Sequence, residues 1–476
     1  MTRTLACLPL VMIVLATNAL ASVEVRSVGD VRIYGIFFQN RNFTSWNADG
    51  TATEDTLQIY QRLRVRTDFT ANEALKFRLG VMVNDTAWGN GTYTADAPTV
   101  SLQVYQAYLQ FFWPDTEVEF TIGLQPVSLP QAPLFYDSVV MASKNETKSA
   151  AAMIVTAPVI ADTLEVNLGF TRRLDTNGQF DTATTQRDDE LDLFFLTAPL
   201  SLDGITVTPW GMAGVVGADA GLPSSLQSTL LSGGSFIYPR GFHNNQNLAL
   251  WGGASVIIDA LDPVIIQADA IYGQAGMTDA GRNLRRGTFF DLGMQYSGLS
   301  FLTPKLGLWW ASGEDGSLTN GSERIPMIST NFGMGNSFLF ACNQDFTNDN
   351  LGVDPSGSMG ATLAFENISL VEKMSHLLSL TAMTGTSSAK GMALAVGASG
   401  GNGRYVTMGK NLAQGEWLLG VEFETKYMVY QNLALILETG WATLSGAKSG
   451  VWNTPRRFTG MVNDAWKASL GFKYTF

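Results

Sequence analysis

The feature that most constrains this chain is the alternation of apolar and polar side chains along many segments of about ten residues. In the clearest segment, residues 58–69, apolar side chains from Ile59 to Phe69 share one face and charged side chains share the other. A period of two is that of a β-strand with two unlike faces, whereas a helix would scatter both sets. The pattern returns in about 18 segments, which predicts one large antiparallel sheet.

The gaps between these segments alternate between short and long. The short ones include residues 70–73, 113–116, 259–262 and 430–432. The long ones are rich in Gly, Asn, Asp, Ser and Thr, and they are residues 38–56, 84–100, 126–150, 213–246, 311–358 and 385–414. Short turns at one end and long loops at the other are typical of outer-membrane barrels, in which the sheet must close so that every backbone amide is paired.

We therefore predict an all-β fold, a transmembrane antiparallel β-barrel of 16 to 18 strands with long extracellular loops and short periplasmic turns. The count favours 18 strands, but residues 359–385 fit either two strands or one strand and a short helix. A soluble β-sandwich or β-helix is the alternative. Aromatic residues near strand ends favour the membrane, where they would form interface girdles, and they are Trp113, Tyr272, Trp441, Trp466, Tyr474 and Phe476.

The first 21 residues have the pattern of a signal peptide. Arg3 precedes an apolar run from Leu5 to Ala16, and Ala19-Leu20-Ala21 is a small-x-small cleavage pattern. An apolar core of about 12 residues is shorter than the ~20 that a spanning helix needs. We predict cleavage after residue 21, export to the outer membrane, and a single barrel domain over residues 22–476.

The C-terminal ten residues end in Phe476 and carry Phe472 and Tyr474 at alternate positions. They look like the terminal strand by which the barrel-assembly machinery recognises outer-membrane proteins of Gram-negative bacteria. The whole mature chain resembles bacterial porins, and residues 103–111 and 123–130 are similar to those of the homotrimeric porins of sulfate-reducing bacteria. The resemblance implies a homotrimer of barrels in outer-membrane lipid, a partnership with that machinery, and ion transport by passive diffusion.

A barrel of 16 to 18 strands leaves an aqueous lumen, which an inward loop can narrow. By its position in the chain, the third long loop, residues 126–150, is the candidate constriction loop. Its charged residues are Asp137, Lys144, Glu146 and Lys148. The segment after the fifth strand lacks the Pro-Glu-Phe-Gly-Gly motif of enterobacterial porins, which leaves the path of this loop open.

Five cations on two neighbouring strands are the candidate pore-lining residues that set selectivity. Facing lipid, each would cost ~2 to 4 kcal/mol near the midplane, so we expect them to face the lumen and attract anions. They are Arg62, Arg64, Arg66, Lys76 and Arg78.

In the alternative, loop carboxylates such as Asp137 and Glu146 pair with these cations, and inward acids elsewhere leave only weak selectivity. Those acids are Glu119, Glu165, Asp192, Asp269, Asp291, Glu422, Glu424 and Glu438. The net charge of −12 bears on solubility rather than on the pore.

No motif in the chain indicates catalysis. The two histidines, His243 and His376, have no nucleophile and carboxylate arranged around them in sequence, and no phosphate-binding loop or transition-metal spacing occurs. Oxygen ligands at residues 343–350 and Asp354 leave open a Ca²⁺ site in an extracellular loop, although the spacing is not that of an EF-hand.

We expect no enzyme activity, no cofactor and no nucleic-acid partner, and we interpret the chain as a porin for small hydrophilic solutes. A solute-specific channel and a surface scaffold or adhesin are the alternatives, with a barrel hydrolase as a rival of another class.

Overall fold

The computed structural model describes fifteen stretches of the chain. They are residues 23–45, 56–89, 100–131, 138–141, 149–175, 190–217, 247–276, 284–317, 320–328, 337–340, 345–346, 350–398, 406–448, 450–452 and 462–476. The predicted signal peptide, residues 1–21, lies outside them. Within these stretches, no helix is long and apolar enough to cross a membrane.

The regular secondary structure of the described residues consists almost entirely of strands in a single sheet. They are β1 (Glu24–Gln39), β2 (Thr56–Asn72), β3 (Leu75–Ala87), β4 (Gln103–Phe112), β5 (Glu119–Gln125), β6 (Ala150–Ile160), β7 (Leu164–Asp175), β8 (Glu190–Thr197), β9 (Leu200–Leu202), β10 (Ile205–Val216), β11 (Asn247–Leu261), β12 (Val264–Ala275), β13 (Arg285–Tyr296), β14 (Thr303–Ala311), β15 (Ser358–Val371), β16 (Met374–Gly385), β17 (Trp417–Tyr430), β18 (Leu433–Ser445) and β19 (Ala465–Thr475). A helix, α3 (Ala389–Ala398), follows β16.

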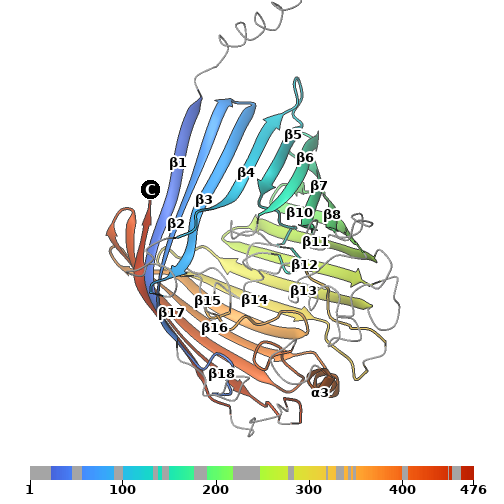
Figure 1. Cartoon of the computed structure of the whole chain (residues 1–476), viewed down its shortest axis with the longest axis vertical. Coiled ribbons are helices and arrows are strands. Elements are labelled where there is room, and N and C mark those ends of the chain that lie inside the picture. The colour runs from blue at the N-terminus through green and yellow to red at the C-terminus, as the bar shows by residue number, and fades with distance from the viewer. Residues whose placement is uncertain are drawn as a thin grey trace, which may run out of the picture.

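The sheet closes on itself, because β1 pairs antiparallel with both β2 and β19 (Figure 1). The two short strands β8 and β9 share one position in the wall, since each pairs with β7 on one side and β10 on the other. Pro199, which has no backbone N–H to donate, lies where this position is interrupted. The 19 strands therefore make an 18-stranded antiparallel barrel, and the predicted fold class is confirmed.

Residues 359–385, which the sequence left open, belong to two strands. β15 and β16 pair over most of their length and turn between Val371 and Met374. Lys373 takes a positive φ of 61° in this turn. The connections also alternate as expected, with tight turns at one end and all the connections longer than ten residues at the other. Both ends of the described chain lie at the end with the tight turns.

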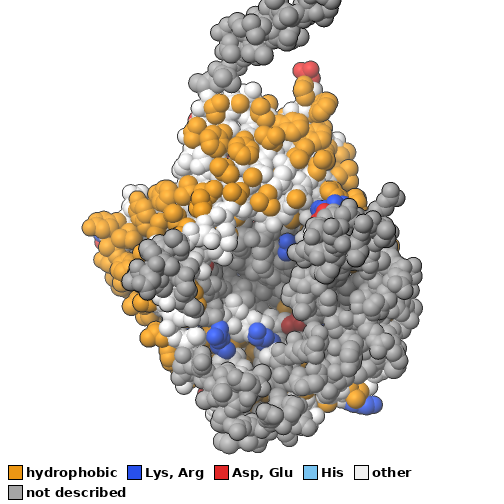
Figure 2. All heavy atoms as spheres, viewed as in Figure 1, with side chains coloured by type: hydrophobic (Ala, Val, Ile, Leu, Met, Phe, Trp, Pro, Cys, Tyr) orange, Lys and Arg blue, Asp and Glu red, His pale blue; other side chains and the backbone are white. Residues whose placement is uncertain are grey.

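The two faces of the wall differ as the alternation predicts. On β17, Trp417 and Leu419 are exposed on the outer face, whereas Leu418 and Glu422 are buried on the inner face. Figure 2 shows apolar side chains spread over the strands, with several Lys and Arg side chains around a hollow. Five of the six predicted girdle aromatics are exposed, and Trp441 is partly exposed with its ring centroid 6.2 Å from that of Trp466.

One of the predicted inward acids is placed wrongly by the sequence. Asp192 lies on the outer face of β8 with the exposed Phe194 and Leu196, near the end of the barrel that carries the long loops. Its carboxylate pairs with Arg172 of β7 at 2.9 Å, so neither charge faces lipid unpaired. The inner positions of β8 are instead apolar, and Leu191 is fully buried there.

Candidate functional site

The cations predicted to line the pore lie on the inner face of β2 and β3. Asp30 of β1 pairs with Arg62 at 2.8 Å, with Arg64 at 2.8 Å and with Arg32 at 3.1 Å. Arg62 also lies 3.9 Å from Asp85 of β3. The strand register produces this cluster, because it sets Asp30 opposite Arg64 and Arg32 opposite Arg62.

The remaining cations lie nearer to the turn between β2 and β3. Arg78 donates two hydrogen bonds to Asp68, at 2.6 and 2.7 Å, and a third to the Tyr108 hydroxyl at 3.0 Å. Arg66 and Lys76 occupy the inner positions on either side of the Asp68–Arg78 pair. Among the described residues, the carboxylates seen to pair with the predicted cations come from the strands of the wall.

Exposure divides the predicted cations into two groups. Arg62 is buried, with 2% of its surface exposed, whereas Arg64, Arg66, Lys76 and Arg78 are all partly exposed. Arg62 therefore belongs to the structure of the wall, and the other four are the cations that a solute in the lumen can reach.

The predicted constriction loop, between β5 and β6, enters the barrel in the parts that are described. Val127, Leu129 and Val140 are buried. The Gln131 side chain donates a hydrogen bond of 2.7 Å to Asp291 on β13, a strand six positions away from β6 around the wall. The charged residues assigned to this constriction, Asp137, Lys144, Glu146 and Lys148, lie outside the described residues, so their role stays a prediction.

A second inward loop lies between β14 and β15, where the sequence predicted only a long extracellular loop. Its Leu339 N–H donates to Glu422 at 2.9 Å, and the Lys467 ammonium donates to the Phe338 carbonyl at 3.2 Å. Glycines make room for it, because a Cβ at Gly420 would lie 2.5 Å from Phe340. The apolar run of residues 338–340 inside a loop rich in Gly and Asn was the signal in the sequence.

The same loop also contacts a second part of the inner wall, where tryptophans gather on β10, β11 and β14. The Trp251 indole of β11 donates to the Pro326 carbonyl at 2.8 Å, and that of Trp309 on β14 donates to the Ser358 hydroxyl at 3.1 Å. Both tryptophans and Trp210 of β10 are buried. This part of the inner wall is therefore a packed interface and not a surface of the lumen.

Some of the inward acids hold the loops, whereas Glu119, Glu165 and Glu424 lie on the inner wall and are partly exposed. Glu422 accepts hydrogen bonds from Leu339 N–H and the Ser337 hydroxyl, and Glu438 accepts one of 3.2 Å from Phe346 N–H. Asp291 accepts from Gln131 and lies opposite Asp269 in the register of β12 and β13. These carboxylates therefore do not act as free charges in the lumen.

The β14–β15 loop has a buried carboxyl of its own, Glu314. Ser322 donates a hydrogen bond to the Glu314 carboxyl, and the Glu314 backbone N–H donates one of 3.3 Å to the Ser387 hydroxyl. Burial raises the pKa of Glu314 to about 7, and the charge of Arg324 opposes this rise only in part.

The possible Ca²⁺ ligands of this loop pair with cations where they are described. Asp345 pairs with Lys426 at 2.6 Å and with Lys473, and Asp354 pairs with Arg324. Within the described stretches, no group of three or more His, Cys, Asp or Glu is arranged to hold a metal ion. Residues 343–344 and 347–349 lie outside those stretches.

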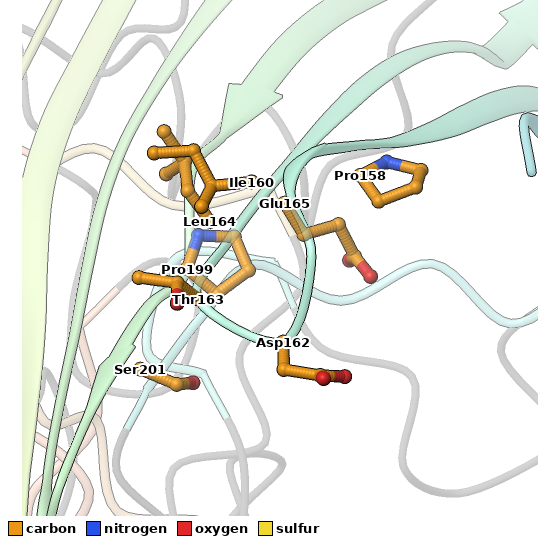
Figure 3. Close-up of a pocket in the computed structure, with 8 residues that line it drawn as sticks. All are labelled: Pro158, Ile160, Asp162, Thr163, Leu164, Glu165, Pro199 and Ser201. Atoms are coloured by element: carbon orange, nitrogen blue, oxygen red, sulfur yellow. The ribbon is translucent and has the colours of Figure 1, made fainter.

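The remaining features suggest no chemistry. A pocket of about 370 Å³ lies between the β6–β7 turn and Pro199, and Asp162 and Glu165 are the charged residues among the eight described ones that line it (Figure 3). An apolar groove of about 630 Å³ lies on the wall formed by β6 to β11. His376 stacks on Phe423 of the outer face at 5.5 Å and contacts the Thr425 hydroxyl at 2.9 Å, while His243 lies outside the described residues.

The predicted assembly residues lie on the outer face of the last strand. Phe472, Tyr474 and Phe476 are all exposed there. Backbone hydrogen bonds of 2.8 and 3.0 Å join Phe476 to Gly29 of β1. Recognition of these residues by assembly machinery stays a prediction.

Comparison with known proteins identifies relatives in structure only. No protein-family model and no curated protein sequence matches the chain. Among solved structures, the chain is similar to OccAB1 of Acinetobacter baumannii, with a TM-score of 0.53 and 8% identity over 96% of this chain and 99% of that one. It is also similar to OccK11 (OpdR) of Pseudomonas aeruginosa, with a TM-score of 0.50 and 12% identity over 95% and 96% of the two chains. At this identity the similarity establishes a shared fold, an 18-stranded barrel of the Occ type.

Proposed function

We propose that this protein is an outer-membrane porin, a water-filled channel through which small hydrophilic solutes and ions diffuse passively. A closed barrel with a largely apolar outer face suits lipid, because the sheet leaves no unpaired edge and its outward Asp192 and Arg172 are paired with each other. The observation that carries the proposal is the set of partly exposed cations on the lumen side of β2 and β3. Such side chains on the wall of an aqueous pore bias which ions pass without binding them tightly.

The expected selectivity is a mild preference for anions. Arg64, Arg66, Lys76 and Arg78 are open to the lumen, and Asp30 and Asp68 neutralise them only in part. Asp269, Asp291, Glu422 and Glu438 are buried and hold loops or each other, so they oppose the preference weakly. The partly exposed Glu119, Glu165 and Glu424 oppose it more directly and keep it mild.

The reversal potential of the purified protein in a planar bilayer under a KCl gradient tests this function. We expect stable conductance and a reversal potential on the anion side, which moves toward zero in the Arg62→Ala/Arg64→Ala/Arg66→Ala protein. Conductance with the same reversal potential in both would keep the channel and remove the arginines from selectivity. Absence of conductance in a folded wild-type barrel would refute the porin proposal.

A solute-specific channel is the second candidate, and the two inward loops favour it. Segments of the β5–β6 and β14–β15 loops both contact the inner wall, so the open cross-section is smaller than that of the barrel. Uptake into proteoliposomes separates the two functions. Rates that saturate with one class of solute would establish specificity, whereas rates that depend only on solute size would establish general diffusion.

We also propose that the protein is exported by cleavage after residue 21 and assembles as a homotrimer. The porin resemblance supports the trimer, and the apolar groove over β6 to β11 is compatible with a face that packs against a neighbour. Native mass spectrometry of detergent-solubilised protein measures both properties. A monomer whose mass includes residues 1–21 would contradict both.

A further inference from the structure

The charged side chains of the lumen form a belt that continues around the wall from β14 to β3. It begins with Lys305 of β14 and Glu366 of β15, which pair at 2.8 Å. It continues through Lys426 of β17 and Lys473 of β19 to the carboxylate of Asp30 and its three arginines. Most members of the belt find their partner on an adjacent strand, because register places opposite charges side by side.

The belt is interrupted at β16, whose inner residues are uncharged, and again at β18. This strand lies between β17 and β19, and its register sets Ile436 opposite Lys426 and Ala434 opposite Lys473. Both of these inner positions are apolar and buried. The next inner residue of β18, Glu438, accepts a hydrogen bond from Phe346 N–H of the inward loop. Two lysines therefore flank an apolar strand.

Asp345 of the β14–β15 loop supplies the missing carboxylate. One of its oxygens lies 2.6 Å from the Lys426 ammonium, and the other pairs with Lys473. Its backbone carbonyl accepts a hydrogen bond from Arg32 of β1. Although burial alone would raise the pKa of Asp345, Lys473 and Lys426 hold it below its ordinary value, so the side chain stays ionised. A single loop residue thus contacts three strands.

The residue next to Asp345 fixes the same part of the loop. The Phe346 ring stacks on Tyr34 of β1, with the ring centroids 4.5 Å apart and the planes at 14°. Tyr34 in turn donates a hydrogen bond of 2.5 Å to Asp85, which also lies beside Arg62. The loop is therefore joined to the arginine cluster on one side and to the two lysines on the other.

We propose that Asp345 is a selectivity-determining and positioning residue, which holds the β14–β15 loop against the wall and masks the charges of Lys426 and Lys473. This inference rests on the proposed channel function. The lysine side chains keep 31% and 24% of their surface exposed, so their charges act on the lumen when Asp345 no longer cancels them. The ion preference of the pore is then set jointly by strand cations and by one carboxylate that a loop brings in.

The test compares reversal potentials of wild type, Asp345→Asn, Asp345→Glu and Asp354→Asn in planar bilayers at low salt. We expect Asp345→Asn to raise the anion-to-cation permeability ratio on the order of twofold, with the shift fading at 1 M salt as screening increases. Asp345→Glu should restore most of the wild-type ratio. Asp354→Asn is the matched control, because Asp354 lies in the same loop but pairs with Arg324 and not with Lys426 or Lys473.

A conducting Asp345→Asn channel with the wild-type reversal potential would overturn the inference and leave the porin function intact. Lack of conductance in the wild type would instead overturn the function. If the Asp345→Asn protein does not fold, as judged by the heat-modifiable band of a folded barrel on a gel, the Lys426→Gln/Lys473→Gln protein tests the inference instead. Its ratio should move toward cations, since the carboxylate would then be unopposed, and an unchanged ratio would overturn the inference.

Discussion

The inner wall formed by β1 to β3 and the inner wall formed by β10 to β14 belong to one sheet but do different work. The first carries arginines whose partners are carboxylates of neighbouring strands. The second carries Trp210, Trp251 and Trp309, and the β14–β15 loop accepts a hydrogen bond from Trp251. The difference shows that an inward position of a large barrel does not by itself make a residue pore-lining. Inner side chains form either the surface of the lumen or a surface on which a loop packs, which we call the seat of that loop.

Glycines on neighbouring strands make room for the tryptophans on the inner wall of β10 to β14. A Cβ at Gly273 would lie 2.6 Å from Trp251, and one at Gly253 would lie 2.9 Å from Trp210. The tryptophan rings therefore lie flat across neighbouring strands, which leaves room for the loop above them. On the charged wall, Gly80 gives similar room to Tyr105, but the adjoining inner positions hold long cationic chains.

The largest effect on conductance should come from a substitution that blocks the site where the β14–β15 loop packs on β17. In Gly420→Val the new side chain would overlap Phe340, whose ring lies 2.5 Å from the Cβ position, so we expect the loop to leave this seat and conductance to rise on the order of twofold. Single-channel recording measures it. Gly211→Val is the control, because its Cβ position meets nothing closer than 3.7 Å. Equal conductance in both variants and wild type would mean that the loop does not narrow the pore.

A smaller effect should separate the two groups of cations on the charged wall. Arg66→Ala removes a partly exposed cation and should lower the anion-to-cation permeability ratio by roughly a third. Arg62→Ala removes a buried one and should change the ratio less, while it lowers the temperature at which the barrel unfolds on a gel, because Asp30 loses a partner. The reverse order of the two ratios would contradict the division by exposure.

The smallest effect is a pH dependence of how firmly the β14–β15 loop packs on the wall. The pKa of Glu314 is raised from its ordinary 4.5 to about 7 by burial, so the seated loop holds a proton that the released loop loses. The stability that this proton gives is complete below about pH 4.5 and is lost as pH rises through about 7. Cleavage of the loop by a protease active over this range should accelerate with pH in wild type and vary less in Glu314→Gln. A steeper dependence in the variant would contradict this assignment.

The sequence predicted the barrel well because alternation reports directly on which strand faces differ. The strand count, the closed antiparallel sheet and the inward arginines all follow from that period and from the cost of charges in lipid. The same reasoning was wrong for Asp192, because it equated polar with inward. Near the loop end of β8 an outer acid can pair with Arg172, and the inner positions there are apolar.

The seat of the loops was beyond sequence reasoning for a physical reason. Trp251 and Trp309 alternate with other apolar residues, so their strands have two apolar faces and the period does not say which face a loop covers. The partners of Asp345 likewise lie far away in the chain, at Lys426 and Lys473. Only the assembled wall brings them together. The position of the β5–β6 loop was predicted from its order along the chain, and its contact with Asp291 supports an inward path.

The seam between β1 and β19 has a consequence for how such a chain reaches its final state. β1 pairs with β2 along one edge and with β19 along the other, and Phe476 is hydrogen-bonded to Gly29. The second edge of β1 is therefore covered only when β19 is in place. Until then the growing sheet has two rows of unpaired N–H and C=O groups, which other chains can bind. Closure of this wall thus depends on β19, and both edges stay open to other chains for as long as that strand is missing.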